Sequence, residues 1–276
     1  MKEERLKSLL VFAGSLLLVS FSLVPIAYMI VTSLSVDPHF LAARAKFEFT
    51  WLHYHSVLTV ESLHFLDYLV NSLIVSASSA LIAILIASLA AYAVTRLDWP
   101  GKALVMFFVV AVSMFPQISL ISYLFKFMGA LGLINTYPAL IFPYVAWTLP
   151  LTLWVLVSYF AQIPRDLDRA AIVDGCSRLQ ALRHVIYPVA RPGIFSALLL
   201  AFIYSYNEFL LALMLTTDHS ARTIPVGIAL FEGLHGQIPW GEITAAASLS
   251  TMPLVAMTLV FQRHIIQGLT MGAIKG

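Results

Sequence analysis

The stretch DRAAIVDGCSRLQALRHVIYP, residues 168–188, interrupts a largely apolar chain and decides how its fold is interpreted. It holds three arginines, two aspartates, a histidine, an internal glycine and a terminal proline. The segments on both sides are apolar enough to lie in lipid. An ordered polar insert between two such segments needs an explanation, and that explanation depends on the rest of the chain.

The composition indicates a membrane protein. Of the 276 residues, 60% are hydrophobic and only 11% are charged, whereas about a quarter of the residues in a soluble domain are charged. Runs of about 20 or more uncharged residues recur along the chain, and about 20 apolar residues are what a helix needs to cross the hydrocarbon core. We therefore predict an all-α membrane protein with one transmembrane domain over residues 1–276. Its expected spans are about 9–32, 69–94, 103–125, 138–160, 193–217 and 243–265.

The cysteine and histidine content excludes several classes of protein. The single cysteine, Cys176, excludes an internal disulfide framework and a cysteine-based metal cluster. His53 and His55 lie two residues apart, but no cysteine or acidic residue stands at ligand spacing from them, so no metal site is expected. All eight histidines fall outside the centres of the expected spans, which argues against a haem protein or an intramembrane hydrolase.

The basic residues predict the orientation in the membrane. Lysine and arginine are enriched in cytoplasmic loops. With both termini in the cytoplasm, 12 of the 16 basic residues fall on the cytoplasmic side and 4 outside. The polar insert is then cytoplasmic. We expect a multi-pass protein of the plasma membrane, in contact with lipid and without a nucleic-acid partner.

Within the insert, the residues predict two short helices that meet at a corner. Pro164 suits a first helical turn, and Gly175 suits a helix C-terminus. Ser177 and Gln180 have the spacing of a capping box, which indicates that a second helix begins at once. This helix is expected to end at Pro188, and such an elbow could transmit the movement of a cytoplasmic partner.

The insert resembles the EAA loop of permease subunits in bacterial ATP-binding-cassette importers. That loop reads Glu-Ala-Ala, three residues, Gly, nine residues, Ile, one residue and Leu-Pro. This chain places Arg169, Ala170, Ala171, Gly175, Val185, Tyr187 and Pro188 at the same spacing. The departures are arginine for glutamate, valine for isoleucine and tyrosine for leucine, and Asp168 could partly replace the glutamate. AAYAVTRLDWPGK, IPRDLDRAAIVDG, YSYNEFLLAL and GLTMGAIKG also resemble the maltose- and trehalose-type carbohydrate branch.

The resemblance implies a type I importer permease with six transmembrane helices and a coupling helix in a cytoplasmic loop over residues 161–191. The chain would form half of the path for a sugar such as a disaccharide or oligosaccharide. Its partners would be a second homologous permease, two copies of an ATPase and an extracytoplasmic sugar-binding protein. The residues expected to couple to the ATPase are Asp168, Arg169, Ala170, Ala171, Asp174, Gly175 and Pro188.

The sequence itself indicates that ATP is hydrolysed elsewhere. A phosphate-binding loop needs Gly, four residues, and Gly-Lys followed by Ser or Thr. The only Gly-Lys pair is Gly101-Lys102, and Ala103 follows it. This chain is therefore expected to be a transport subunit rather than an enzyme. It would carry no cofactor of its own, because ATP and magnesium would bind to the partner ATPase.

A polar group within the fifth expected span suggests part of a substrate path. Tyr204, Asn207 and Glu208 fall at helical spacings of three and four, so these side chains are expected to share one face. Gln117, beside Pro116 in the third span, is a further candidate, because prolines kink helices that line cavities. A carboxylate facing lipid is costly, so Glu208 should face either a cavity or a structural hydrogen-bond partner. The sequence leaves both readings open.

Other function classes remain as alternatives. A permease for another solute class would share the same insert. A secondary transporter would need coupling-ion sites, usually with inverted repeats and paired ionisable groups in the membrane, and the sequence shows neither. A membrane enzyme would need a constellation of catalytic residues, and none that contains histidine is evident.

Overall fold

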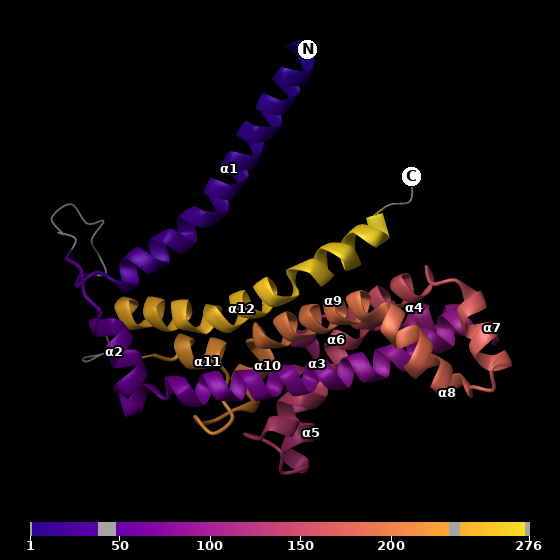
Figure 1. Cartoon of the computed structure of the whole chain (residues 1–276). Helices are drawn as coiled ribbons and strands as arrows, with labels where there is room; N and C mark the ends of the chain where they lie inside the picture. The colour runs from indigo at the N-terminus through magenta and orange to yellow at the C-terminus, as the bar shows by residue number, and fades with distance from the viewer. Residues whose placement is uncertain (1, 38–47, 232–237, 274–276) are drawn as a thin grey trace. The chain divides into compact units, whose positions relative to one another are not determined.

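The computed structural model describes residues 2–37, 48–231 and 238–273, and these are almost entirely helical (Figure 1). An isolated bridge between Ser35 and Phe49 is the one β pairing within those ranges. The chain divides into two compact units. One comprises residues 1–65 and 228–252, and the other comprises residues 66–227 and 253–276.

The first unit combines a long apolar helix with an ordered polar junction. Its elements are α1 (Lys2–Ser33), α2 (Leu52–Thr59), the short 3₁₀ turn η1 (Glu61–Leu63) and the beginning of α12 (Trp240–Ala273). At the junction, the buried His53 has Nε2 3.0 Å from the carbonyl oxygen of Ser35 and Nδ1 3.1 Å from Glu242 Oε1. Gly241 lies so close to the imidazole of His53 that a Cβ atom there would overlap it.

The second unit contains most of the helices and the polar insert. Its elements are α3 (Phe65–Arg96), α4 (Lys102–Ser113), α5 (Gln117–Ala130), α6 (Tyr137–Phe160), α7 (Arg165–Val173), α8 (Arg178–Ala181), a π-helical turn (Leu182–Ile186), α9 (Tyr187–Tyr206), α10 (Leu210–Leu215), α11 (Ile224–Ala229) and the rest of α12. Helices α7 and α8, which form the polar insert, lie together at one end of this unit (Figure 1).

Small side chains allow the helices of the second unit to pack closely. Helices α6 and α9 contact each other along their lengths, and Gly193 of α9 lies directly against the ring of Tyr159 on α6. On α3, Ala83, Ala87 and Ala91 are fully buried at four-residue spacing. Close approach of backbones is the usual basis of helix association in lipid, where no hydrophobic force drives the helices together.

The expected third span is divided into two helices. Among the residues that the structure describes, five helices are long and apolar enough to cross a membrane, and a sixth span results only if α4 and α5 count as one. These two helices are bent by 90° at the break. Pro116, which directly precedes α5, has no backbone N–H and an extended ψ of 124°, so the helix cannot continue through it. Pro143 and Pro150, by contrast, lie within the single helix α6.

The helix in the region of the expected fifth span, 193–217, has different bounds from that span. The helix already begins at Arg178 and ends at Tyr206. The second helix of the insert therefore does not end at Pro188. The chain makes a π-helical turn in which the N–H of Tyr187 donates to the carbonyl oxygen of Leu182, five residues earlier. A π turn accommodates a residue without an N–H group, so the chain passes through Pro188 into the membrane as one continuous helix.

Candidate coupling site and transport path

The polar insert forms the predicted elbow. Helix α7 ends at Val173, and Gly175 follows with a φ of +88°, a left-handed conformation that glycine adopts without strain. The N–H of Cys176 donates to the carbonyl oxygen of Ala171 at 2.9 Å and closes the helix end. The corner is therefore fixed by the backbone, as the sequence predicted.

The capping box at the start of α8 is confirmed in both directions. The N–H of Gln180 donates to Ser177 Oγ at 3.3 Å, and the N–H of Ser177 donates to Gln180 Oε1 at 2.7 Å. These bonds satisfy donors that the first turn of a helix leaves without intrahelical partners. Because α8 starts at Arg178, three residues after the glycine, the two helices of the elbow have a defined relative orientation.

The outer surface of the elbow carries large exposed apolar side chains beside charged ones. Val173 is 85% exposed and Leu179 is 65% exposed, while Arg169 and Asp174 are also exposed. The ion pair of Arg169 with Asp166 is fully solvated and contributes little to stability. Contiguous apolar groups with a charged rim, held on a rigid corner, are typical of a surface that contacts another protein.

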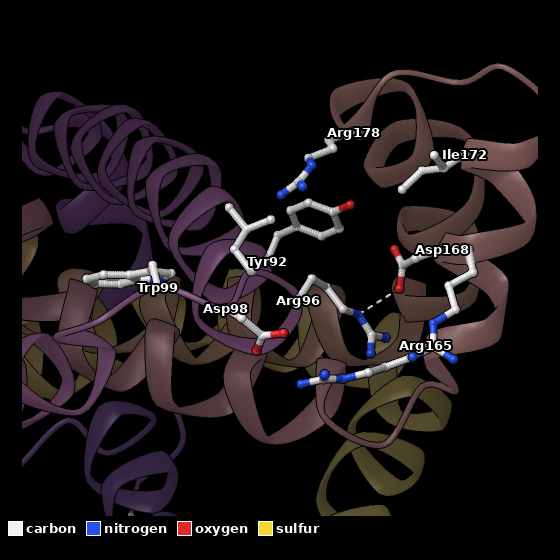
Figure 2. Close-up of a pocket in the computed structure, with 10 residues that line it drawn as sticks. Tyr92, Arg96, Asp98, Trp99, Arg165, Asp168, Ile172 and Arg178 are labelled. Atoms are coloured by element: carbon white, nitrogen blue, oxygen red, sulfur yellow. Dashed lines mark ion pairs between the residues drawn. The ribbon is translucent and has the colours of Figure 1, made fainter.

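A buried ion pair joins the elbow to the end of α3. Arg96 Nε lies 2.9 Å from Asp168 Oδ2, and the two side chains are only 4% and 10% exposed (Figure 2). Arg96 also donates from Nη2 to the carbonyl oxygen of Ile163 at 2.8 Å. The structure thus places Asp168 inside this chain, where it positions α7 instead of standing open to a partner as the sequence suggested.

Further contacts strengthen this junction. Arg165 donates from Nη2 to the carbonyl oxygen of Thr95 at 3.1 Å. The hydroxyls of Ser88 on α3 and Tyr187 at the start of α9 are 2.7 Å apart. Tyrosine therefore replaces the leucine of the EAA pattern with a polar contact to α3. Contacts with α3 therefore hold both ends of the elbow, in addition to the covalent connections to α6 before it and α9 after it.

A basic cavity of about 500 Å³ opens beside the ion pair. Four arginines from α3, α7 and α8 line it together with Tyr92, Asp98 and Trp99; they are Arg96, Arg165, Arg169 and Arg178 (Figure 2). The cavity lies where α3 ends and α4 begins, so these arginines gather where spans leave the membrane. This concentration of basic residues agrees with the charge distribution that predicted a cytoplasmic insert.

The substrate-path candidates do not share one helical face, because α9 ends at Tyr206. Glu208 lies in the break before α10 and is buried. Its Oε1 accepts a hydrogen bond from the N–H of Leu211 at 2.8 Å, and its Oε2 accepts from Ala212 at 3.1 Å and from the hydroxyl of Tyr144 at 2.7 Å. These bonds give Glu208 a structural role within this chain, because the carboxylate caps α10, and they favour the structural reading over the substrate-path reading.

The other three candidates remain accessible. Tyr204 is 42% exposed, and its hydroxyl oxygen accepts a hydrogen bond from Gln117 Nε2 at 3.1 Å. Asn207 is exposed and donates to the carbonyl oxygen of Ile203 at 2.8 Å. Gln117 begins α5 and Tyr204 lies near the end of α9, so this hydrogen bond links the two interrupted spans.

Comparison with known proteins identifies the family. Residues 81–271 match the family described as binding-protein-dependent transport system inner membrane component. The chain belongs to this family. It is 53% identical to the trehalose/maltose transport system permease protein of Thermococcus litoralis, with 100% of both chains covered. It is 40% identical to the trehalose transport system permease protein of Mycobacterium tuberculosis, with 94% of this chain and 95% of the relative covered.

The fold agrees with this assignment. A chain in the crystal structure of a bacterial ABC transporter that imports the polysaccharide alginate superposes with a TM-score of 0.79. The alignment covers 95% of this permease and 98% of that chain at 19% identity, so the likeness supports the type I importer permease fold. The family is the membrane component of ABC transporters, which is the role that the sequence predicted for this chain.

Sequence reasoning missed three features of the site. It did not predict Arg96 as the partner of Asp168, because nothing local to either residue indicates a pairing between segments so far apart in sequence. The hydrogen bond between Gln117 and Tyr204 was equally hidden. The end of α9 at Tyr206 was missed as well, because apolar residues resume at Phe209 and the sequence therefore suggests one continuous span.

Proposed function

We propose that this permease forms half of the path by which an ATP-driven importer moves a sugar across the plasma membrane of a bacterium or archaeon. A second homologous permease would complete the path. An extracytoplasmic binding protein would deliver the sugar, as the family description implies. The relatives from Thermococcus litoralis and Mycobacterium tuberculosis point to a trehalose- or maltose-like disaccharide or oligosaccharide.

The observation that carries the proposal is the rigid elbow of α7, Gly175 and α8. Its exposed apolar surface, centred on Val173 and Leu179, would seat in a groove of an ATPase subunit. Two copies of the ATPase would serve the two permeases, and they would hold ATP and magnesium. Nucleotide-driven movement of the groove would then shift the elbow, and the elbow would move α9 with it.

The residues expected to contact or shape this interface divide into two groups. Arg169, Ala170, Asp174 and Gly175 are exposed and would meet the ATPase directly. Asp168 and Ala171 are buried and would hold the elbow in shape. Pro188 lies beyond the elbow, at the turn where the chain enters α9, and would set the direction of that helix.

The proposal includes an orientation with both termini in the cytoplasm. The distribution of basic residues supports it. In a variant lacking Cys176, a cysteine at Ser220 should react with an impermeant maleimide from outside intact cells. A cysteine at Arg178 should react only after the membrane is opened. The reverse labelling would show that the elbow is extracytoplasmic and could not meet an ATPase.

Purification of the complete importer tests the function itself. Tagged permease should retain the ATPase, and ATP hydrolysis by the complex should rise when the sugar-loaded binding protein is added. The same ATPase measurement is repeated with disaccharides, amino acids and metal ions, each added together with the importer's own binding protein. The solutes that stimulate hydrolysis show whether the substrate is a sugar or belongs to another class. Stimulation by a solute other than sugar would contradict the proposed substrate. A permease that retains no ATPase would contradict the proposed mechanism.

A further inference from the structure

A second cavity of about 500 Å³ lies within the span region, away from the elbow. Its wall is formed by α4, α6 and α9 and includes the aromatic residues Trp147, Trp154 and Tyr204 together with Ser113. Trp147 and Trp154 are seven residues apart on α6, about 10 Å along the axis and nearly on one face. Trp154 is 58% exposed, so most of its ring is free to contact a ligand.

Polar groups border this aromatic wall at a depth where lipid would penalise them. Ser113 and Tyr204 are exposed, and Gln117 donates to the Tyr204 hydroxyl at 3.1 Å. The hydroxyl of Ser113 donates to the carbonyl oxygen of Val110 at 2.7 Å. The amide of Gln117 and the hydroxyl of Tyr204, however, each keep hydrogen-bonding capacity that hydrocarbon would leave without a partner. Polar side chains in spans therefore generally face a wet cavity or another protein.

The backbone gives an independent indication of a wet cavity. The span of α4 and α5 is broken next to Ser113, and the helix α9 ends next to Tyr204. Helix ends leave backbone groups without intrahelical partners. Such irregular backbone is tolerated at membrane depth only where it is buried in protein or lines a water-filled cavity. In transporters, interrupted helices of this kind commonly surround the substrate.

We infer that this cavity is a carbohydrate subsite contributed by this permease. The indole rings of Trp154 and Trp147 would pack on the apolar faces of a pyranose ring, and Gln117, Tyr204 and Ser113 would bond its hydroxyls. Aromatic walls with a few placed polar groups are the usual composition of small-molecule sites. The inference rests on the proposed function, and it assigns sugar contacts to this subunit as well as to its partner permease.

The matched pair Trp154→Ala and Phe142→Ala tests the subsite. Both side chains lie on α6, at 58% and 60% exposure, but Phe142 is outside the lining of the cavity. The complete importer, with its binding protein, is reconstituted with ATP and labelled trehalose, and with labelled maltose in parallel. W154A should lower sugar uptake per ATP hydrolysed by roughly tenfold, as loss of an aromatic anchor does. F142A should match the wild type.

A labelling experiment gives a second readout that does not depend on full activity. W154C and F142C are made in a C176S background and are alkylated by a maleimide during turnover. Trehalose should slow the alkylation of W154C and leave F142C unchanged. This measurement still tests the subsite if W154A assembles poorly, because alkylation can be detected in a small fraction of assembled W154C complexes.

The outcomes separate this inference from the proposed function. A wild-type complex that imports no sugar overturns both. The subsite alone is overturned if the wild-type complex imports sugar, W154A and F142A take up sugar equally, and sugar does not protect W154C from alkylation. Protection of W154C by the presence of the partner permease, with or without sugar, would show that this surface is a subunit interface and would also overturn the subsite.

Discussion

Arg96 Nε and Asp168 Oδ2 lie 2.9 Å apart, and their contact joins the C-terminal end of α3 to the first turn of α7. Both side chains are almost completely buried. A buried ion pair is costly to form, but removing one partner alone leaves an uncompensated charge in the protein interior. The pair therefore fixes the elbow to α3, and movement imposed on the elbow should be transmitted to α3 as well as to α9.

Breaking this pair should uncouple the elbow. We expect Arg96→Gln to destabilise the permease by about 3 kcal/mol, the range found when one member of a buried pair is removed. The complex should then hydrolyse ATP with less stimulation by the sugar-loaded binding protein. The measurements are the thermal unfolding of the purified permease and the ratio of stimulated to basal ATP hydrolysis.

The control for this prediction is Arg169→Gln. Arg169 pairs with Asp166 at the surface, and both side chains are more than 70% exposed, so its effect on stability should stay below about 1 kcal/mol. The double variant Arg96→Asp with Asp168→Arg should recover part of the loss. Equal stability of R96Q and the wild type would show that the pair does not hold the elbow.

Gly175 should tolerate only residues that accept a left-handed backbone. A Cβ atom added at this position meets nothing within 4 Å, so the penalty arises from the φ of +88° and not from a clash. Gly175→Val should cost about 1–2 kcal/mol, leave membrane levels of the permease normal and weaken retention of the ATPase. Asparagine adopts this conformation more readily, so Gly175→Asn should retain more ATPase. Co-purification with tagged permease measures both, and equal retention would refute the geometric argument.

Glu208 should matter for folding. Glu208→Ala removes the acceptor of two backbone N–H groups and of the Tyr144 hydroxyl. Each buried donor left without a partner costs about 1–3 kcal/mol, so the variant should accumulate poorly and unfold at a lower temperature. Tyr144→Phe, which removes one of the three bonds, should be milder. A Glu208→Ala protein that is as stable as the wild type but transports no sugar would restore the substrate-path reading.

The loop that follows α10 has a testable acid–base property. Hydrogen bonds from Asn135 and Ser220 lower the pKa of Asp218 from its ordinary value of 3.8 to about 2. Because the pKa is lower in the folded state, the stabilising contribution of this carboxylate is present above pH 3.8. It is lost as the pH falls through about 2. Carboxyl NMR should give this pKa, and Asn135→Ala should raise it, whereas an unchanged value would exclude the bond from Asn135 as its cause.

Local signals in the sequence were sufficient for the elbow. Gly175 occupies the left-handed corner, and Ser177 with Gln180 forms the capping box, because glycine and capping residues act through backbone geometry within a few residues. The apolar runs also predicted long apolar helices, since the length of a span is set by the thickness of the membrane. Even the broken third span follows from a local cause, the proline at position 116.

Long-range contacts were beyond the sequence. Apolar residues resume at Phe209, directly after Asn207 and Glu208, so the sequence does not mark the end of α9 at Tyr206. The capping of α10 by Glu208 becomes visible only with Tyr144 beside it. Pro188 suggested a helix end, but a π turn carried the helix past it. The partnership of Arg96 with Asp168 depends on how α3 and α7 pack, which no local pattern specifies.

The most direct measurement is uptake of labelled trehalose into proteoliposomes that contain this permease, its partner permease, the ATPase and the binding protein. Uptake should require ATP on the side that carries the elbow, require the binding protein on the opposite side, and fall in the Gly175→Val complex. Uptake by the permease without ATPase, driven by an ion gradient, would contradict the proposal that the elbow couples ATP hydrolysis to sugar transport.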